Sequence, residues 1–123
     1  MGHVEKKIRG FKDLVIWQMS MELVGEIFRL TRTFPEEERY GLSAQMRRAA
    51  VSIPSNVSEG FNRYHNKEYK QFLYHALGSC AELETQVLIA AQQGFLKGEN
   101  ANTLAETLDH IQATPRNLIK KLK

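Results

Sequence analysis

The chain has 123 residues, of which 42% are hydrophobic and 25% charged, and its formal net charge is +3. This composition is typical of one globular domain, and the apolar runs are far shorter than the roughly 20 residues that cross a bilayer. The single cysteine, Cys80, excludes an internal disulfide framework and favours a reducing compartment. Because the first residues also lack the apolar stretch of a signal peptide, we expect a cytoplasmic protein without a membrane partner.

Residues 1–123 are expected to form a single four-helix domain. Three prolines and eight glycines leave little room for long loops, and no internal repeat is present. Residues 1–10 are expected to be a flexible basic segment that precedes the first helix.

The first helix is predicted at about residues 11–34 and ends before Pro35. Its apolar side chains cover an arc of roughly 200°, against roughly 100° for a helix that faces one core. We therefore expect it to bury one face in its own bundle and another against a second chain. The alternative is a central helix in a lopsided bundle. The apolar set is Leu14, Ile16, Trp17, Met21, Leu23, Val24, Ile27, Phe28, Leu30 and Phe34.

The second helix is predicted at about residues 43–61, with Ser43 as its N-cap. Pro54 falls inside it, so we expect a kink where the proline removes an amide donor and frees the carbonyl of Ala50. The hydroxyls of Ser52 and Ser55 are placed to satisfy the freed groups.

The third helix is predicted at about residues 66–93 and ends at Gly94, a residue suited to the C′ position. Glu84 falls in its apolar arc, between Leu77 and Leu88. A carboxylate there needs a partner, and we expect Arg47 or Arg48 of the second helix to provide it.

The fourth helix is predicted at about residues 100–122, and Thr103 and Glu106 have the spacing of a capping box. Pro115 lies on its apolar seam, where a bend is expected. Short connections between long helices favour antiparallel neighbours. The predicted fold class is therefore all-α, an antiparallel up-down-up-down four-helix bundle.

In such a bundle, both termini and the connection between the second and third helices share one end, which we call the basic pole. Eleven basic and four acidic residues there give a net charge of +7, and the opposite end carries −4. Ordinary solvated charge is the alternative interpretation. The candidate nucleic-acid-binding residues are Lys6, Lys7, Arg9, Lys12, Arg63, Lys67, Lys70, Arg116, Lys120, Lys121 and Lys123.

Three aromatic residues near this pole, Trp17, Tyr64 and Tyr69, could stack on bases, although Trp17 and Tyr69 are better explained as core residues.

The sequence offers no catalytic residue, metal site or cofactor motif. The four histidines lack metal-ligand spacing, and Cys80 lies in the middle of an apolar stripe. Glu82 and Glu84 are two residues apart on a helix and so face different directions. We therefore predict that the protein is not an enzyme.

Three segments resemble the four-helix bundle proteins encoded in intervening sequences of bacterial 23S rRNA genes. They are FKDLVIWQ at 11–18, QMRRAAVSIPSNVSEG at 45–60 and GSCAELETQ at 78–86. The resemblance implies a homopentameric ring and accounts for a proline inside the second helix. It implies structural or assembly roles for Trp17, Arg47, Arg48, Pro54, Asn56, Glu59, Gly60, Glu82 and Glu84. A related group, the accessory proteins of diversity-generating retroelements, are basic pentamers that bind a reverse transcriptase and nucleic acid.

The chain departs from this family at two positions. His65 stands where the family usually has a serine cap, so Asn66 is expected to take that role. Pro115 stands where the family continues its fourth helix.

Together these observations predict a non-enzymatic homopentamer that associates with RNA or DNA, with RNA favoured, through the basic pole. The alternative is a scaffold or adaptor for a reverse transcriptase or another nucleic-acid enzyme.

Overall fold

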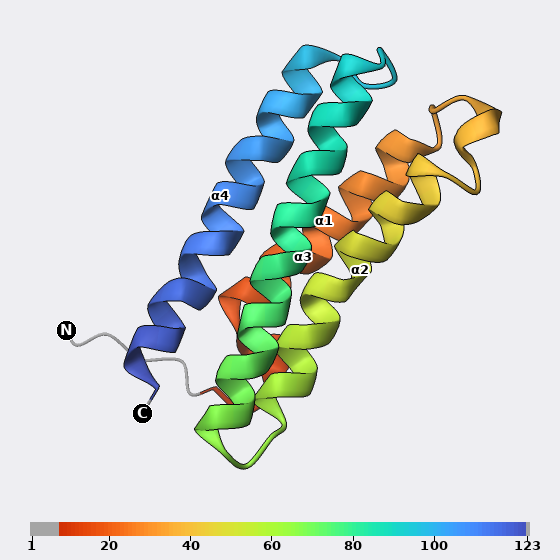
Figure 1. The fold of residues 1–123 in the computed structure, drawn as a ribbon. Coiled ribbons are helices and arrows are strands. Elements are labelled where there is room, and N and C mark those ends of the chain that lie inside the picture. The colour runs from red at the N-terminus through yellow and green to blue at the C-terminus, as the bar shows by residue number, and fades with distance from the viewer. Residues whose placement is uncertain (1–7, 123) are drawn as a thin grey trace.

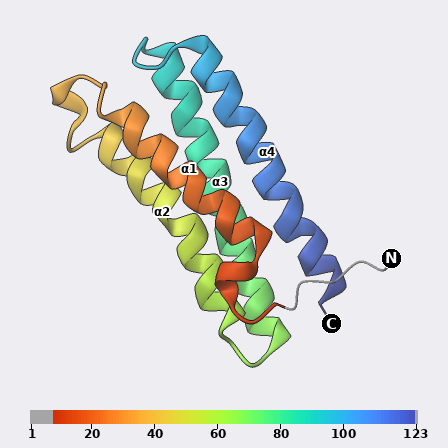
Figure 2. The same cartoon turned by 180° about the vertical axis from the view of Figure 1, so that it is seen from behind.

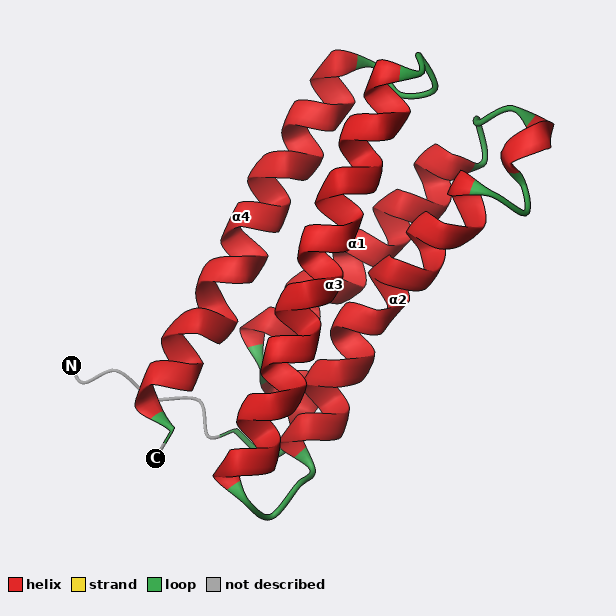
Figure 3. Ribbon diagram, viewed as in Figure 1, coloured by secondary structure: helices red, strands yellow, loops and turns green. Residues whose placement is uncertain are grey.

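The computed structural model describes residues 8–122, and these residues contain helices and no strand. The predicted all-helical fold is thus confirmed, with four long helices connected by short turns (Figures 1 and 3). In chain order the elements are the 3-10 turn η1 (Phe11–Asp13), α1 (Val15–Thr31), the 3-10 turn η2 (Glu36–Glu38), α2 (Leu42–Phe61), α3 (Asn66–Gln92) and α4 (Gly98–Lys121).

The connections lie at the two ends of the molecule. The α1–α2 and α3–α4 connections are at the upper end of Figure 1, and the α2–α3 connection, η1 and the end of α4 are at the lower end. Figure 2 shows the same arrangement from behind. The helix α2 packs most extensively against α3, whereas α1 and α4 touch least.

The core is one apolar cluster to which every helix contributes. Its large side chains are almost completely removed from water, and burial of this kind is the main favourable term in folding. They include Ile16 and Ile27 of α1, Met46 and Ile53 of α2, Leu73 and Leu83 of α3, and Leu104, Leu108 and Ile111 of α4.

The first helix is shorter than predicted at both ends. Leu14 adopts an extended conformation that separates η1 from α1, while its side chain stays in the core. The side-chain amide of Gln18 donates to the carbonyl of Lys12 at 2.9 Å, and the Phe11 ring meets Trp17 edge-on. These contacts fold the segment back on α1. At the other end α1 stops at Thr31, three residues before the predicted end.

The N-terminus of α2 differs from the prediction. The N-cap is Gly41 rather than Ser43, which is buried inside the first turn. The carboxylate of Glu38 accepts a hydrogen bond from the Leu42 amide at 3.4 Å, so a side chain of the preceding turn supplies the acceptor.

Pro54 lies inside α2, as predicted. The Ser55 hydroxyl donates to the Val51 carbonyl at 2.8 Å, one residue beyond the carbonyl of Ala50. The Ser52 hydroxyl instead pairs with that of Ser79 in α3 at 2.7 Å. Ser52 therefore connects two helices. Neither hydroxyl bonds the freed carbonyl of Ala50, so the expected role of both serines was wrong.

The expected partner of Glu84 was also wrong. Its carboxylate accepts a hydrogen bond from Gln112 of α4 at 3.3 Å, because Glu84 lies on the side of α3 that faces α4. Arg47 donates to the Thr31 hydroxyl at 2.8 Å and covers the Phe28 ring. Leu88, expected in the apolar arc with Glu84, is 62% exposed.

The prediction for the C-terminal end of α3 was correct, whereas that for its N-terminal end was not. Gly94 has φ +79, and the amides of Phe95 and Gly94 donate to the carbonyls of Ala90 and Ala91. This pair of hydrogen bonds is a Schellman motif, and it confirms Gly94 as the predicted C′ glycine. At the other end His65 is the N-cap and Asn66 is already helical, so the expected cap at Asn66 was wrong.

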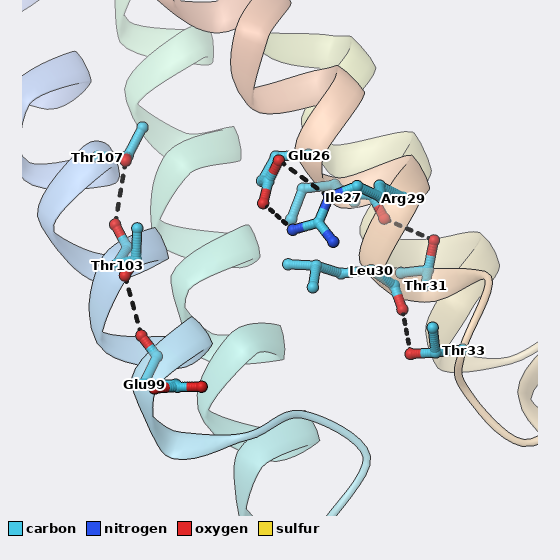
Figure 4. A network of polar contacts seen from close by, with 9 residues as sticks. All are labelled: Glu26, Ile27, Arg29, Leu30, Thr31, Thr33, Glu99, Thr103 and Thr107. Atoms are coloured by element: carbon cyan, nitrogen blue, oxygen red, sulfur yellow. Dashed lines mark hydrogen bonds and ion pairs between the residues drawn. The ribbon is translucent and has the colours of Figure 1, made fainter.

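The helix α4 begins earlier than predicted, at Gly98 with Lys97 as its N-cap. The Thr103 hydroxyl donates to the Glu99 carbonyl at 3.0 Å, so the expected capping box is absent and Thr103 lies within the helix (Figure 4). Pro115 is buried and the helix continues through it to Lys121.

We predict that Gly60→Ala destabilises the protein. A Cβ at Gly60 would lie 2.6 Å from the Cβ of Phe72 and 3.2 Å from the Tyr69 ring, so α2 and α3 would have to separate. Overpacking of this kind costs about 1–3 kcal/mol, which equilibrium denaturation by urea would measure.

Gly25→Ala is the matched control. A Cβ there meets nothing within 4 Å, so the same substitution should be neutral or stabilise α1 by up to about 1 kcal/mol. Equal stabilities for the two variants would contradict the role assigned to Gly60.

Candidate nucleic-acid interface

The structure places eight of the eleven candidate nucleic-acid-binding residues at its lower end in Figure 1. Arg9 and Lys12 flank the start of η1, Arg63 lies in the α2–α3 connection, and Lys67 and Lys70 belong to the first turns of α3. The last turns of α4 carry Arg116, Lys120 and Lys121. Lys6, Lys7 and Lys123 lie outside the described residues, as does the greater part of the expected flexible segment, residues 1–7.

Most of this charge is available to solvent. Seven of the eight side chains are exposed, and Lys70 is half-buried. Lys67, Lys70, Lys120 and Lys121 make no ion pair with any other residue in 8–122. Three acids at this end, Asp13, Glu59 and Glu68, leave a net charge of +5 for the described part of the basic pole.

Two of the arginines are held by neighbouring side chains. Arg63 lies 4.9 Å from the centre of the Phe72 ring and 3.6 Å from the Glu59 carboxylate. Arg116 donates to the side-chain carbonyl of Gln112 at 3.3 Å. An exposed ion pair such as Arg63–Glu59 is weak, so Arg63 can exchange it for another anion at little cost.

The three aromatic residues near the basic pole differ in exposure. Tyr64 is 99% exposed beside Arg63, where a base could stack on its ring. Trp17 packs edge-on against Phe11, and Tyr69 packs against Phe61. Burial raises the pKa of Tyr69, which agrees with a ring held in the protein.

The segment 45–60, which forms most of α2, helps to connect this helix to its neighbours. The Asn56 amide donates to the carbonyl of Ser52 at 2.8 Å and to its hydroxyl at 3.0 Å, beside the Ser52–Ser79 hydrogen bond. Sequence reasoning missed Ser79 and Gln112, because a polar residue on a helix does not reveal which neighbour it faces. The carboxylate of Glu82 accepts from Gln86 at 3.3 Å, and Arg48 is exposed.

The opposite end of the molecule is acidic and hydroxyl-rich. A groove of about 220 Å³ between α1 and α4 is lined by Glu22 and Glu26 from α1 and by Asn100, Thr103 and Thr107 from α4, over an apolar floor. In Figure 4 Glu26 pairs with Arg29, and the threonine hydroxyls bond to carbonyls of their own helices. Arg29 lowers the pKa of Glu26 through this hydrogen bond. The charge of this end is thus opposite in sign to that of the basic pole.

Residues 8–122 hold neither a gathered set of metal ligands nor a helix suited to span a membrane. No group of three or more His, Cys, Asp and Glu side chains is gathered there in a form that could hold a metal ion. No helix of this part of the chain combines the length and apolarity that a membrane span requires.

The family model described as 23S rRNA-intervening sequence protein matches residues 12–116. The chain belongs to this family. The match covers the three segments that carry the resemblance, except Phe11, together with all four helices except residues 117–121 of α4.

A solved structure supports the fold. It is a protein of unknown function from the S23 ribosomal protein family of Bacteroides thetaiotaomicron, with a TM-score of 0.80 and 20% identity. The alignment covers 86% of this chain and 99% of that chain. No curated protein matches the chain. The comparisons thus indicate no enzymatic family.

We predict that Cys80 is inert in the folded protein. Burial, and secondarily the charge of Glu84, raises the pKa of its thiol to about 12. At pH 8 the thiolate is then about a thousandfold rarer than in an unfolded chain, where the thiol pKa is near 8.5. Alkylation by iodoacetamide, followed by mass spectrometry, should be slow in buffer and fast in guanidinium chloride. Rapid labelling of the native protein would show that the thiol is accessible.

Proposed function

We propose that this family member is a non-enzymatic, homo-oligomeric protein that associates with RNA through the basic pole. The observation that carries the proposal is the cluster of cations at one end, seven of the eight exposed. Among them, Lys67, Lys70, Lys120 and Lys121 have no ion-pair partner in the described chain. Basic side chains without an ion-pair partner can bind phosphates. The counterions that the nucleic acid then releases make binding favourable at low salt.

The location of the cations argues for a ligand. Lys67 and Lys70 lie in the first turns of α3, where the partial positive charge of a helix N-terminus disfavours lysine. An anion bound there would be attracted by the side chains and by the helix terminus together. Lys120 and Lys121 suit a helix C-terminus, so the dipole already explains them in part.

Assembly would strengthen this binding. We propose an antiparallel, up-down-up-down bundle, which the positions of the connections in Figures 1 and 2 support, and a ring of such bundles, pentameric as the family resemblance implies. If the ring axis runs along the helices, every basic pole lies on one side of the ring. Phosphate contacts then multiply with the number of subunits. The single buried thiol agrees with a cytoplasmic location.

Exposed apolar side chains support a second candidate function, a scaffold or adaptor for a reverse transcriptase or another nucleic-acid enzyme. Val15, Tyr74 and Leu88 are each more than half exposed. Pull-down from a cell extract with and without nuclease separates the two functions. A protein partner retained after nuclease treatment favours the adaptor, and loss of all partners favours RNA association.

The proposed interface predicts salt-dependent binding to a structured RNA, which fluorescence anisotropy would measure. Replacing Lys67, Lys120 and Lys121 together by Glu should weaken binding at least about tenfold and lower the slope of log K against log salt by about 2–3. The control reverses three charges at the other end, in Arg32, Arg39 and Lys97, and should change binding little. No binding by the unmodified protein at low salt, or equal losses in both triple variants, would refute the proposed interface.

The proposed assembly predicts the mass of the protein in solution. Light scattering should give a multiple of the 14.1 kDa chain, about 70 kDa for a pentamer. A mass of one chain would refute the assembly while leaving the RNA measurement to stand separately.

A further inference from the structure

Two uncharged surfaces remain exposed on opposite parts of the bundle. The first is the α1/α2 groove, a hollow of about 330 Å³ lined by Phe11, Trp17, Met21 and Val24 and, from α2, by Val51, Pro54, Ser55 and Ser58. None of these side chains carries a charge. Met21 and Val51 are 45% and 41% exposed, so the chain's own folding leaves this groove open to water.

The second surface is the α3 ridge, a row of exposed residues on the outer face of α3. Its members are separated by four, three, four and three positions, which places them on one face of a helix. They are Tyr74, Gly78, Ala81, Thr85 and Leu88. Tyr74 and Leu88 are 59% and 62% exposed at its two ends, and the positions between them are small and uncharged.

Gly78 lies at the centre of the α3 ridge, where it would let another backbone approach closely. A Cβ at this position would meet nothing within 4 Å, so the fold of the single chain does not require glycine there. Glycine inside a helix is destabilising relative to alanine. Its use at the centre of an exposed apolar row is explained if another backbone approaches closely at that point.

We propose that the α3 ridge of one copy packs into the α1/α2 groove of the next copy. This inference rests on the self-assembly put forward above and assigns the two faces that produce it. A ridge and a groove on the same chain form a heterologous contact, and repetition of such a contact by rotation produces a ring. One apolar surface then covers the other.

One pair of charges at the borders of the two surfaces is complementary. Arg48 lies three residues before Val51 on α2, at the edge of the groove. Glu82 lies next to Ala81 at the edge of the ridge. Neither forms an ion pair with another residue in 8–122, so both are free to pair across the contact.

The heights of these charges along the bundle also agree. The Ser52–Ser79 hydrogen bond fixes one level shared by α2 and α3. Arg48 lies about 6 Å from that level and Glu82 about 4.5 Å, both toward the upper end of Figure 1, given a rise of about 1.5 Å per residue. Rotation about an axis parallel to the helices keeps heights unchanged. The Arg48 of one copy therefore meets the Glu82 of the next at nearly the same height.

The test uses two variants of the full chain, Gly78→Gln on the α3 ridge and Val51→Lys in the α1/α2 groove. Both positions are exposed, and circular dichroism should show unchanged helix content. Each variant should lose the oligomer and give the mass of one chain by light scattering. Gly98→Gln is the matched control, because a Cβ at Gly98 also meets nothing within 4 Å and lies on neither surface, and it should keep the wild-type mass.

Mixing the two variants tests the heterologous contact itself. The Val51→Lys copy keeps an intact ridge and the Gly78→Gln copy an intact groove, so an equimolar mixture should form one contact and stop at about 28 kDa, two chains of 14.1 kDa. If both variants keep the mass of an oligomeric wild type, or if the mixture stays monomeric, the assignment of these faces is overturned. A monomeric wild type overturns the proposed assembly as a whole, and the RNA measurement is independent of both results.

Discussion

The close contact between α2 and α3 is the constraint on which the rest of the structure depends. Gly60 leaves no space for a side chain against Phe72, and the hydroxyls of Ser52 and Ser79 meet at 2.7 Å further along the same seam. The first contact sets the distance between the helices and the second sets their relative height. Because the connection between these helices is short, Arg63 and the first turns of α3 are brought to the end of the molecule where α1 begins.

The other two helices are attached to this pair by different means. Arg47 of α2 reaches α1 through the Thr31 hydroxyl and the Phe28 ring. Gln112 of α4 reaches α3 through Glu84. The contact between α1 and α4 is the weakest of the bundle, and a groove lies between them near the acidic end. A polar contact thus joins each outer helix to the central pair, while the apolar core supplies most of the stability.

The proposed RNA association and the proposed self-association use different parts of the molecule. The basic pole lies at the end of the bundle, whereas the α3 ridge and the α1/α2 groove lie along its sides. A ring built through the sides leaves the ends free. The same rotation that pairs the apolar surfaces would gather the cations of all subunits on one face, where phosphate binding increases with the number of contacts.

The sequence by itself determined the number, type and approximate extent of the helices. It also determined the C′ role of Gly94, the position of Pro54 within α2 and the uneven distribution of charge along the chain. These features depend on local chemistry: apolar period, proline geometry and glycine at positive φ. The family motif was likewise recognisable from consecutive residues.

Only the tertiary structure decided the partners. It paired Glu84 with Gln112 rather than with an arginine, and it left Leu88 exposed to solvent. It also showed that the Glu38 carboxylate accepts the hydrogen bond from the first amide of α2. A helical period shows which residues share a face, but the identity of the neighbour on that face depends on rotations of the helices about their axes. Those rotations result from the packing of the whole core, and a shift of one residue moves a side chain by about 100°. The exposed α3 ridge could therefore be recognised only once α2 and α4 were in place.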